Sequence, residues 1–135
     1  MRYRVSTWQD TVEREYPDGI STVRAVIGTR RDLPLGEYLP ESSPLFSFGI
    51  AELPPGGRIA AHAHPDREEL FYILEGEGTL TADGDEIACR EGLAVWFGQG
   101  CEHELVNTST GRLRCLFVGI VPHAVAAERA RATRT

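Results

Sequence analysis

Residues 56–78 read GGRIAAHAHPDREELFYILEGEG, and this stretch decides the fold and the chemistry that we predict for the chain. His62 and His64 are two positions apart, so a strand would present both imidazoles on one face, about 7 Å from each other. Pro65 is expected to end this strand, and a short turn then brings Glu69 onto the next one. Neutral imidazoles and carboxylates bind divalent first-row metals. The stretch therefore predicts three ligands of a metal site at the junction of two strands.

A fourth ligand, His103, is expected from GQGCEHELVN, residues 98–107. A pair of histidines alone can arise by chance, and a lone histidine is more often a surface residue or a satisfied core residue. The glycines around both stretches favour a site, because they recur where a small barrel has to bend. With x for any residue, the first pattern is Gly56-x5-His62-x-His64-x4-Glu69-x6-Gly76, and after 15 residues the second is Gly92-x5-Gly98-x-Gly100-x2-His103-x3-Asn107.

These two patterns resemble the two motifs of the cupin family, with the expected residue type at every ligand position. The resemblance covers residues 45 to 121 and departs at Gly98, where the family usually has proline. It implies an all-β cupin jelly roll, also described as a double-stranded β-barrel, that holds one divalent transition metal per chain. The ligands would be His62, His64, Glu69 and His103. Iron(II) or manganese(II) is the expected metal, and nickel, zinc or copper are compatible with the same ligands.

Short apolar segments separated by turn residues run through the chain. We expect strands at residues 20–28, 45–53, 58–64, 69–75, 77–82, 85–90, 93–97, 102–107 and 112–121. A set of about nine strands at this spacing favours a sandwich or barrel. Residues 1–44 form an arm with one strand, which would either cover an open sheet edge or serve as a dimer contact or lid. Residues 45–121 form the barrel, and the alanine- and arginine-rich residues 122–135 form a short helix or a tail.

Composition narrows the class of partner. The chain has 135 residues, a net charge of −6 and a pI near 5.2, which argues against nucleic acid or an anionic membrane as a partner. It contains no apolar run of signal-peptide or membrane-spanning length, so a cytoplasmic protein is expected, as a homodimer acting on a small molecule. Its three cysteines form no CxxC pair, which favours reduced thiols over a disulfide framework. All 14 basic residues are arginine, so no lysine can form a Schiff base and electrophilic chemistry falls to the metal.

Alternation along the strands predicts the walls of a cavity around the metal. The expected lining residues are Phe48, Ala60, Phe71, Ile73, Leu105, Cys115 and Phe117. In residues 45–53 the choice of inward face is open; if the bulkier set of Phe46, Phe48 and Ile50 faces inward, the same parity turns Glu52 toward the metal. Glu52 is therefore a candidate second acid or base. The alternative is a solvated carboxylate at the end of a strand.

The ligand set constrains the mechanism. Three neutral imidazoles and one carboxylate give a divalent ion a net charge of about +1 and leave two adjacent positions in six coordination. A bidentate enediol or β-diketone would fit there, with the metal as Lewis acid and template. We predict a mononuclear metal-dependent enzyme acting on a small oxygenated metabolite. The family resemblance implies a dioxygenase, which we favour, or an isomerase, cyclase, lyase or epimerase that does not use O₂. A metal- or ligand-binding sensor without turnover is the alternative class.

Overall fold

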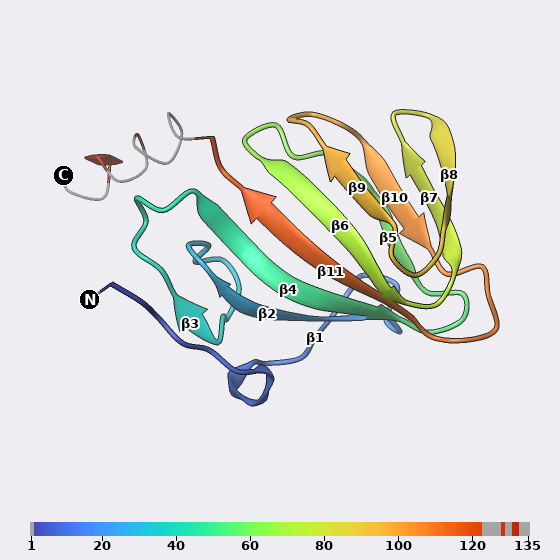
Figure 1. The fold of residues 1–135 in the computed structure, drawn as a ribbon, viewed down its shortest axis with the longest axis horizontal. Coiled ribbons are helices and arrows are strands. Elements are labelled where there is room, and N and C mark those ends of the chain that lie inside the picture. Colours follow the sequence, from blue (N-terminus) through green and yellow to red (C-terminus); the bar gives the residue numbers. More distant parts are fainter. Residues whose placement is uncertain (1, 123–127, 129–130, 133–135) are drawn as a thin grey trace.

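The protein is built from two β-sheets, a larger one and a smaller one (Figure 1). The computed structural model describes residues 2–122, 128, 131 and 132. The elements are the 3-10 helix η1 (Trp8–Asp10) and the strands β1 (Arg14–Glu15), β2 (Thr22–Gly28), β3 (Glu37–Tyr38), β4 (Leu45–Leu53), β5 (Arg58–His62), β6 (Glu68–Glu75), β7 (Gly78–Ala82), β8 (Asp85–Cys89), β9 (Ala94–Phe97), β10 (His103–Val106) and β11 (Leu113–Ile120). The larger sheet has the order β1-β2-β4-β11-β6-β9 with β3 beside β2, and the smaller has the order β5-β10-β7-β8.

The predicted all-β architecture is confirmed, and each of the nine expected ranges overlaps a strand, although the strand expected at residues 58–64 ends at His62 and leaves His64 in the following loop. The structure adds β1 and β3 within residues 1–44. In the part of the chain that the structure describes, no helix is long and apolar enough to span a membrane. The helix or tail expected at residues 122–135 falls largely outside the described residues.

The N-terminal arm, residues 1–44, extends the larger sheet. Strand β2 runs antiparallel to β4, from the pair Thr22–Glu52 to the pair Gly28–Ser47. Strand β1 pairs with β2 in antiparallel and β3 pairs with it in parallel. The arm is therefore hydrogen-bonded to the edge that β4 would otherwise leave open.

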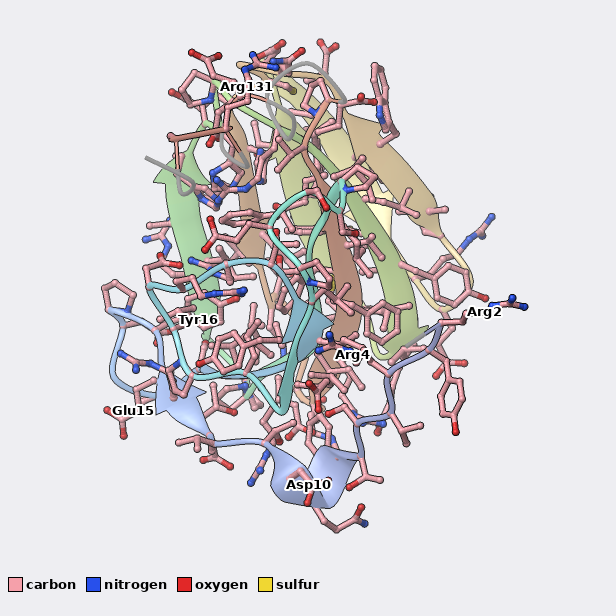
Figure 2. All side chains as sticks on the ribbon, turned by 90° about the vertical axis from the view of Figure 1, so that its left-hand side faces the viewer. Arg2, Arg4, Asp10, Glu15, Tyr16 and Arg131 are labelled. Carbon is pink, nitrogen blue, oxygen red and sulfur yellow. The ribbon has the colours of Figure 1, made fainter. Side chains whose placement is uncertain are left out.

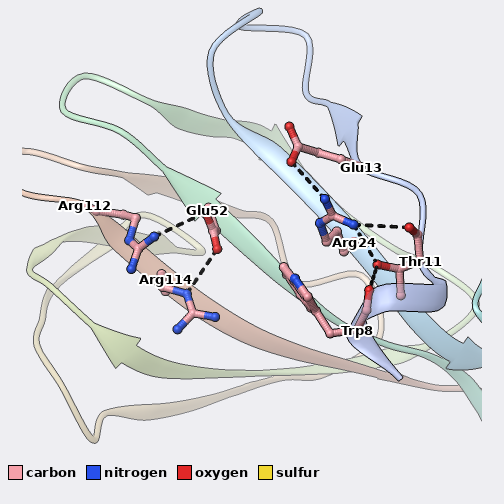
Figure 3. Close-up of polar contacts among 7 residues, drawn as sticks. All are labelled: Trp8, Thr11, Glu13, Arg24, Glu52, Arg112 and Arg114. Atoms are coloured by element: carbon pink, nitrogen blue, oxygen red, sulfur yellow. Dashed lines mark hydrogen bonds and ion pairs between the residues drawn. The ribbon is translucent and has the colours of Figure 1, made fainter. Parts of the chain in front are cut away.

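Arg24 on β2 holds the beginning of the arm in place. Its guanidinium donates to the backbone carbonyl and hydroxyl of Thr11 at 3.2 and 3.1 Å, and to the Glu13 carboxylate at 3.3 Å (Figure 3). The same guanidinium lies 4.9 Å from the centre of the Trp8 ring, within the range of a cation–π contact. The segment that precedes β1 is thus anchored to the sheet by polar contacts.

The core lies between the two sheets. Strand β11 alternates buried and half-buried residues along its whole length, as a strand with one face on a core does. Its buried side chains pack against those of β4 and β6 and against the inner face of the smaller sheet. The largest of these core residues are Leu53, Ile59, Phe71, Ile73, Leu80, Phe97, Leu105, Leu113 and Phe117.

The inward face of β4 is the opposite of the one that we predicted. The side facing the core carries Ser47, Gly49, Ala51 and Leu53. A Cβ at Gly49 would lie 2.6 Å from the Phe117 ring, so β11 fills the space that small residues on β4 leave. Phe48 and Glu52 therefore lie on the outer face.

Glu52 lies among arginines, away from the predicted metal ligands. Its carboxylate accepts a hydrogen bond from Arg114 Nε at 3.2 Å and pairs with Arg112 at 3.7 Å (Figure 3). The register places Glu52 opposite Arg114, one residue out of phase with the buried pair of Ala51 and Cys115. The prediction that Glu52 acts as an acid or base beside the metal is wrong. It assumed that the bulkier side chains of β4 face the core, whereas the Phe117 ring of β11 occupies the space beside Gly49 on that face.

Asn107, the last residue of the second motif, closes the loop between β10 and β11. It is 1% exposed, and its amide donates to the carbonyls of Leu53 and Gly111 at 2.8 and 2.7 Å. Its side-chain oxygen accepts hydrogen bonds from the backbone N–H and hydroxyl of Ser109 at 3.0 and 2.8 Å. One buried side chain therefore satisfies groups from β4 and from the loop.

Replacing Asn107 with alanine should lower the free energy of unfolding by about 1–3 kcal/mol, because it leaves the carbonyl of the buried Leu53 without its Asn107 donor. Urea denaturation followed by tryptophan fluorescence measures the change. Thr108→Ala, at the exposed neighbouring position, is the matched control and should be close to wild type. Equal stability of the two variants would contradict the role given to Asn107.

Asp18 ties the arm to the start of β5. Its carboxylate accepts hydrogen bonds from the backbone N–H groups of Ile20, Ser21 and Arg58 at 3.1, 2.8 and 2.9 Å, and from the Ser21 hydroxyl. Desolvation opposes ionisation of Asp18, but these hydrogen bonds outweigh it and lower its pKa from 3.8 to about 2. The ionised form is the one that holds arm and barrel together.

Asp18→Asn should lower the free energy of unfolding at neutral pH by about 1 kcal/mol. Because the folded-state pKa of Asp18 is depressed, its contribution is present above the unfolded pKa of 3.8 and is lost as the pH falls from there through about 2. Urea denaturation of the variant and the wild type, at neutral pH and in acid, measures both effects. Asp85→Asn, at an exposed position, is the control. A destabilisation by Asp18→Asn that stayed constant into acid would contradict this account.

Candidate metal centre

The four predicted ligands come together inside the barrel. His62 ends β5, His64 lies in the loop that follows, Glu69 is the second residue of β6 and His103 begins β10. Strand pairing sets His62 opposite His103. One ligand atom from each of the four residues lies within 4.8 Å of all the others.

This spacing suits a single ion. Ligand atoms on opposite sides of a metal, each at about 2.0–2.2 Å from it, are about 4.0–4.4 Å apart. The upper bound of 4.8 Å on the observed separations is close to this distance, so small side-chain movements would bring all four atoms onto one ion. Three imidazole nitrogens and one carboxylate oxygen are also a chemically suitable donor set for a divalent transition metal. We refer to His62, His64, Glu69 and His103 as the quartet.

Backbone carbonyls orient two of the imidazoles. His62 Nδ1 lies 2.7 Å from the carbonyl oxygen of Ala60, and His103 Nδ1 lies 3.0 Å from that of Cys101. A ring that donates from Nδ1 presents the lone pair of Nε2 on its other side. This is the arrangement by which outer hydrogen bonds fix the tautomer and direction of a metal-binding histidine.

Electrostatics keep the quartet in a ligating state. Glu69 is 9% exposed, and its Oε1 lies 3.0 Å from His103 Nε2 and 3.7 Å from His64 Nε2. Burial opposes ionisation of Glu69, but its close contacts with these two imidazoles outweigh it and lower the pKa of Glu69 to about 2. Burial lowers the pKa of His62, which favours the neutral ring. A carboxylate and a neutral imidazole are the forms that bind metals.

Aromatic packing immobilises His103. Only 2% of it is exposed, and its ring stacks on Phe97 with centroids 4.1 Å apart and an interplanar angle of 9°. The Phe71 ring meets it edge-on at 5.5 Å and 88°. Phe97 was not predicted as a site residue, although its position at the end of a predicted strand just before the His103 loop was a usable signal.

A cavity of about 190 Å³ adjoins the quartet. The side chains that line it are Tyr16, Val23, Arg30, Leu33, Ile59, His62, His64, Arg67, Glu69, Phe71 and Phe117. Phe71 and Phe117 are thus where alternation placed them. Ile73, Leu105 and Cys115 face inward but lie in the core away from this lining. Phe48 is not part of the lining, since it faces outward from β4.

Because of a β-bulge in β5, Ala60 does not face the cavity as predicted. His103 pairs with His62 but Leu105 pairs with Ile59, so two residues of β5 oppose one residue of β10. The extra residue shifts the parity between Ile59 and His62. Ile59 is therefore buried against the cavity while Ala60 is exposed.

Three polar residues of the cavity were missed. Tyr16 and Arg30 come from the arm, and Arg67 comes from the turn between His64 and Glu69. Figure 2 shows Tyr16 directed toward the body of the protein while its neighbour Glu15 points outward. Burial, with a smaller effect of the Glu69 charge, raises the pKa of Tyr16, so its phenol keeps its proton. The position of Arg67 between two ligands was a signal in the sequence, but nothing there predicted the contribution of the arm.

In this two-sheet barrel, three imidazoles and a carboxylate converge beside a cavity. The protein is therefore a β-barrel protein with a site suited to one metal ion. A model of the cupin domain matches residues 49–119, which is more than half of the chain. The chain therefore belongs to the cupin family.

Individual relatives span several activities. The chain is similar to the oxalate-binding protein of Thermotoga maritima, with 32% identity over 74 residues that cover 55% of this chain and 61% of that protein. It is 28% identical to the tetracenomycin polyketide synthase protein TcmJ of Streptomyces glaucescens, over 52% of this chain and 47% of that protein. The chain thus spans about half to three fifths of the length of these relatives.

A crystal structure from Thermotoga maritima, described as a predicted oxalate decarboxylase, has the same fold. It superposes with a TM-score of 0.68 over 88% of this chain and 100% of that chain, at 21% sequence identity. The likeness at this identity concerns the fold.

Protein purified without added metal should contain close to one transition ion per chain, and the double variant His62→Ala, His64→Ala should contain almost none. Glu69→Gln, which removes one charged ligand, should weaken metal binding by at least about tenfold. Glu52→Gln is the matched carboxylate control and should keep wild-type metal content. Mass spectrometry of the dialysed proteins measures each value. Metal retained by the double histidine variant would eliminate the quartet as the site.

Proposed function

We propose that the protein is a mononuclear metal-dependent enzyme that acts on a small oxygenated metabolite. The observation that carries this proposal is the quartet itself, four ligand atoms within 4.8 Å of one another, three of whose residues, His62, His64 and Glu69, line a cavity. A metal bound there would supply Lewis-acid polarisation and a template for a bidentate oxygen ligand.

The residues around the quartet suit catalysis on a bound ligand. Phe71 and Phe117 give the cavity apolar walls, which limit the water that reaches a ligand and strengthen electrostatic contacts inside. His103 is held between Phe97 and Phe71, so the ligand positions are fixed before a substrate arrives. Tyr16, with its proton retained, is a hydrogen-bond donor within the same cavity.

The size of the cavity limits the substrate. At about 190 Å³ it is smaller than typical pockets for drug-sized ligands, which are about 300–1,000 Å³. A metabolite with a few carbon atoms and two adjacent oxygens fits this volume. The oxalate-binding relative and the polyketide synthase relative support a small oxygenated ligand, although they differ in the chemistry that their names imply.

The narrower proposal is that the reaction uses O₂, as a dioxygenase would. The alternative within the enzyme class is a reaction without O₂, such as isomerisation, cyclisation or decarboxylation. A protein that binds its ligand without turnover is the remaining class, and the buried but accessible quartet argues for turnover because an open ligand position serves a reaction.

Oxygen uptake with metal-reconstituted protein separates these possibilities. We expect consumption of O₂ with at least one member of a panel of small diketones, catechols, enols and oxoacids, and loss of that consumption in Glu69→Gln by at least about 10²-fold. Product formation that proceeds equally without O₂ would replace the dioxygenase by a non-redox enzyme. Tight binding of a panel member without any product, aerobically or anaerobically, would overturn the enzyme proposal in favour of a sensor.

A further inference from the structure

The part of the cavity wall outside the quartet is unexpectedly cationic. Arg30 and Arg67 both line the cavity, with 17% and 13% of their side chains exposed. Both guanidinium groups lie over the ring of Phe46, at 5.0 and 4.3 Å from its centre. Since Phe46 is only 8% exposed, it is a fixed support that brings together two cations from distant parts of the chain.

The two arginines differ in how many of their donor groups have a hydrogen-bond acceptor. Arg30 forms a two-bond pair with Asp32, at 2.8 and 2.7 Å. Arg67 donates from a single nitrogen to Asp66 at 3.1 Å. Arg67 Nε is buried, and among the described residues no group accepts a hydrogen bond from it. A buried donor without an acceptor is costly, so an acceptor on a bound ligand would be strongly favoured.

The charges in the cavity also favour an anion. Asp32 and Asp66 compensate Arg30 and Arg67. With a divalent ion, the three neutral imidazoles and Glu69 carry a net charge of about +1. The surroundings are therefore positive on balance once the metal is present. Guanidinium groups recognise carboxylates through parallel charge-assisted hydrogen bonds, and the phenol of Tyr16 can add another donor.

We propose that Arg67, assisted by Arg30 and Tyr16, binds a carboxylate of the substrate that does not itself bind the metal. The substrate is then a small hydroxy or keto acid with two carboxylates, one end directed to the quartet and the other to the arginines. This inference rests on the proposed function, because it takes the metal to hold the chelating end. It makes the arm, which supplies Arg30 and Tyr16, part of the specificity of the site.

The test compares two ligands that share a chelating end. Malate and 2-hydroxybutyrate have the same α-hydroxy acid group, but a methyl group replaces the second carboxylate in the latter. Titration calorimetry with cobalt(II)-loaded protein gives the dissociation constants, and the visible spectrum of cobalt(II) reports contact of the shared end with the metal. We expect wild-type protein to bind malate at least about tenfold more tightly.

Arg67→Gln should abolish most of this preference while the affinity for 2-hydroxybutyrate and the cobalt content stay near wild type. Arg67→Lys, which keeps the charge but loses the planar donor group, should retain part of the preference. Tyr16→Phe should reduce it by about threefold, the loss of one neutral hydrogen bond. Arg58→Gln is the control, because Arg58 forms a surface pair with Glu104 and does not line the cavity.

Each outcome bears on one of the two proposals. Equal binding of malate and 2-hydroxybutyrate by the wild type, or a preference unchanged by both Arg67→Gln and Tyr16→Phe, would overturn the carboxylate site and leave the metal site standing. Weakening of both ligands to the same extent by Arg67→Gln would reduce Arg67 to a structural role and also overturn it. Failure to bind cobalt, or an unchanged cobalt spectrum with both ligands, would instead overturn the proposed function.

Discussion

The site depends on the pairing of β5 with β10, which sets His62 opposite His103. His103 is the fixed member of this pair, because it is buried, stacked on Phe97 and hydrogen-bonded to a backbone carbonyl. Glu69 reaches it from the other sheet, so the contact between His103 and Glu69 also joins the two sheets at the end of the barrel where the cavity lies. The position of a metal ion would follow from the register of one strand pair.

The β-bulge beside this pair allows two side chains of β5 to face the interior. Without the extra residue in β5, strict alternation would turn either Ile59 or His62 away from the interior. The bulge lets both face inward, one to close the cavity and the other to reach the quartet. Bulges commonly reorient side chains next to functional sites, and here the bulge combines an apolar wall with a polar ligand on the same short strand.

The all-β fold and the clustering of the four residues of the quartet could be predicted from the sequence because these features depend on local spacing. The spacing of the ligands, the turn glycines and the alternation along a strand each depend on residues that are only a few positions apart. The errors concern relations between strands. Ala60 was misplaced because a bulge depends on the register with a partner strand. Phe48 and Glu52 were misplaced because Phe117, far away in the sequence, fills the space beside Gly49. The contribution of Tyr16 and Arg30 was invisible because it depends on where the arm packs.

The residues around the cavity come from two separate parts of the chain, the barrel motifs and the arm. The quartet comes from the two motifs of the barrel, and it defines what any metal placed there would do to an oxygen ligand. The rest of the cavity wall is assembled from a different source, with Tyr16, Val23, Arg30 and Leu33 all supplied by the arm. Val23 lies on β2, which is hydrogen-bonded to β4, while Tyr16 follows β1 and Arg30 and Leu33 follow β2. The cavity beside the quartet is therefore bounded by side chains from two sources, the motifs of the barrel and the arm, and a change in the arm would alter the cavity wall without altering the four ligand residues.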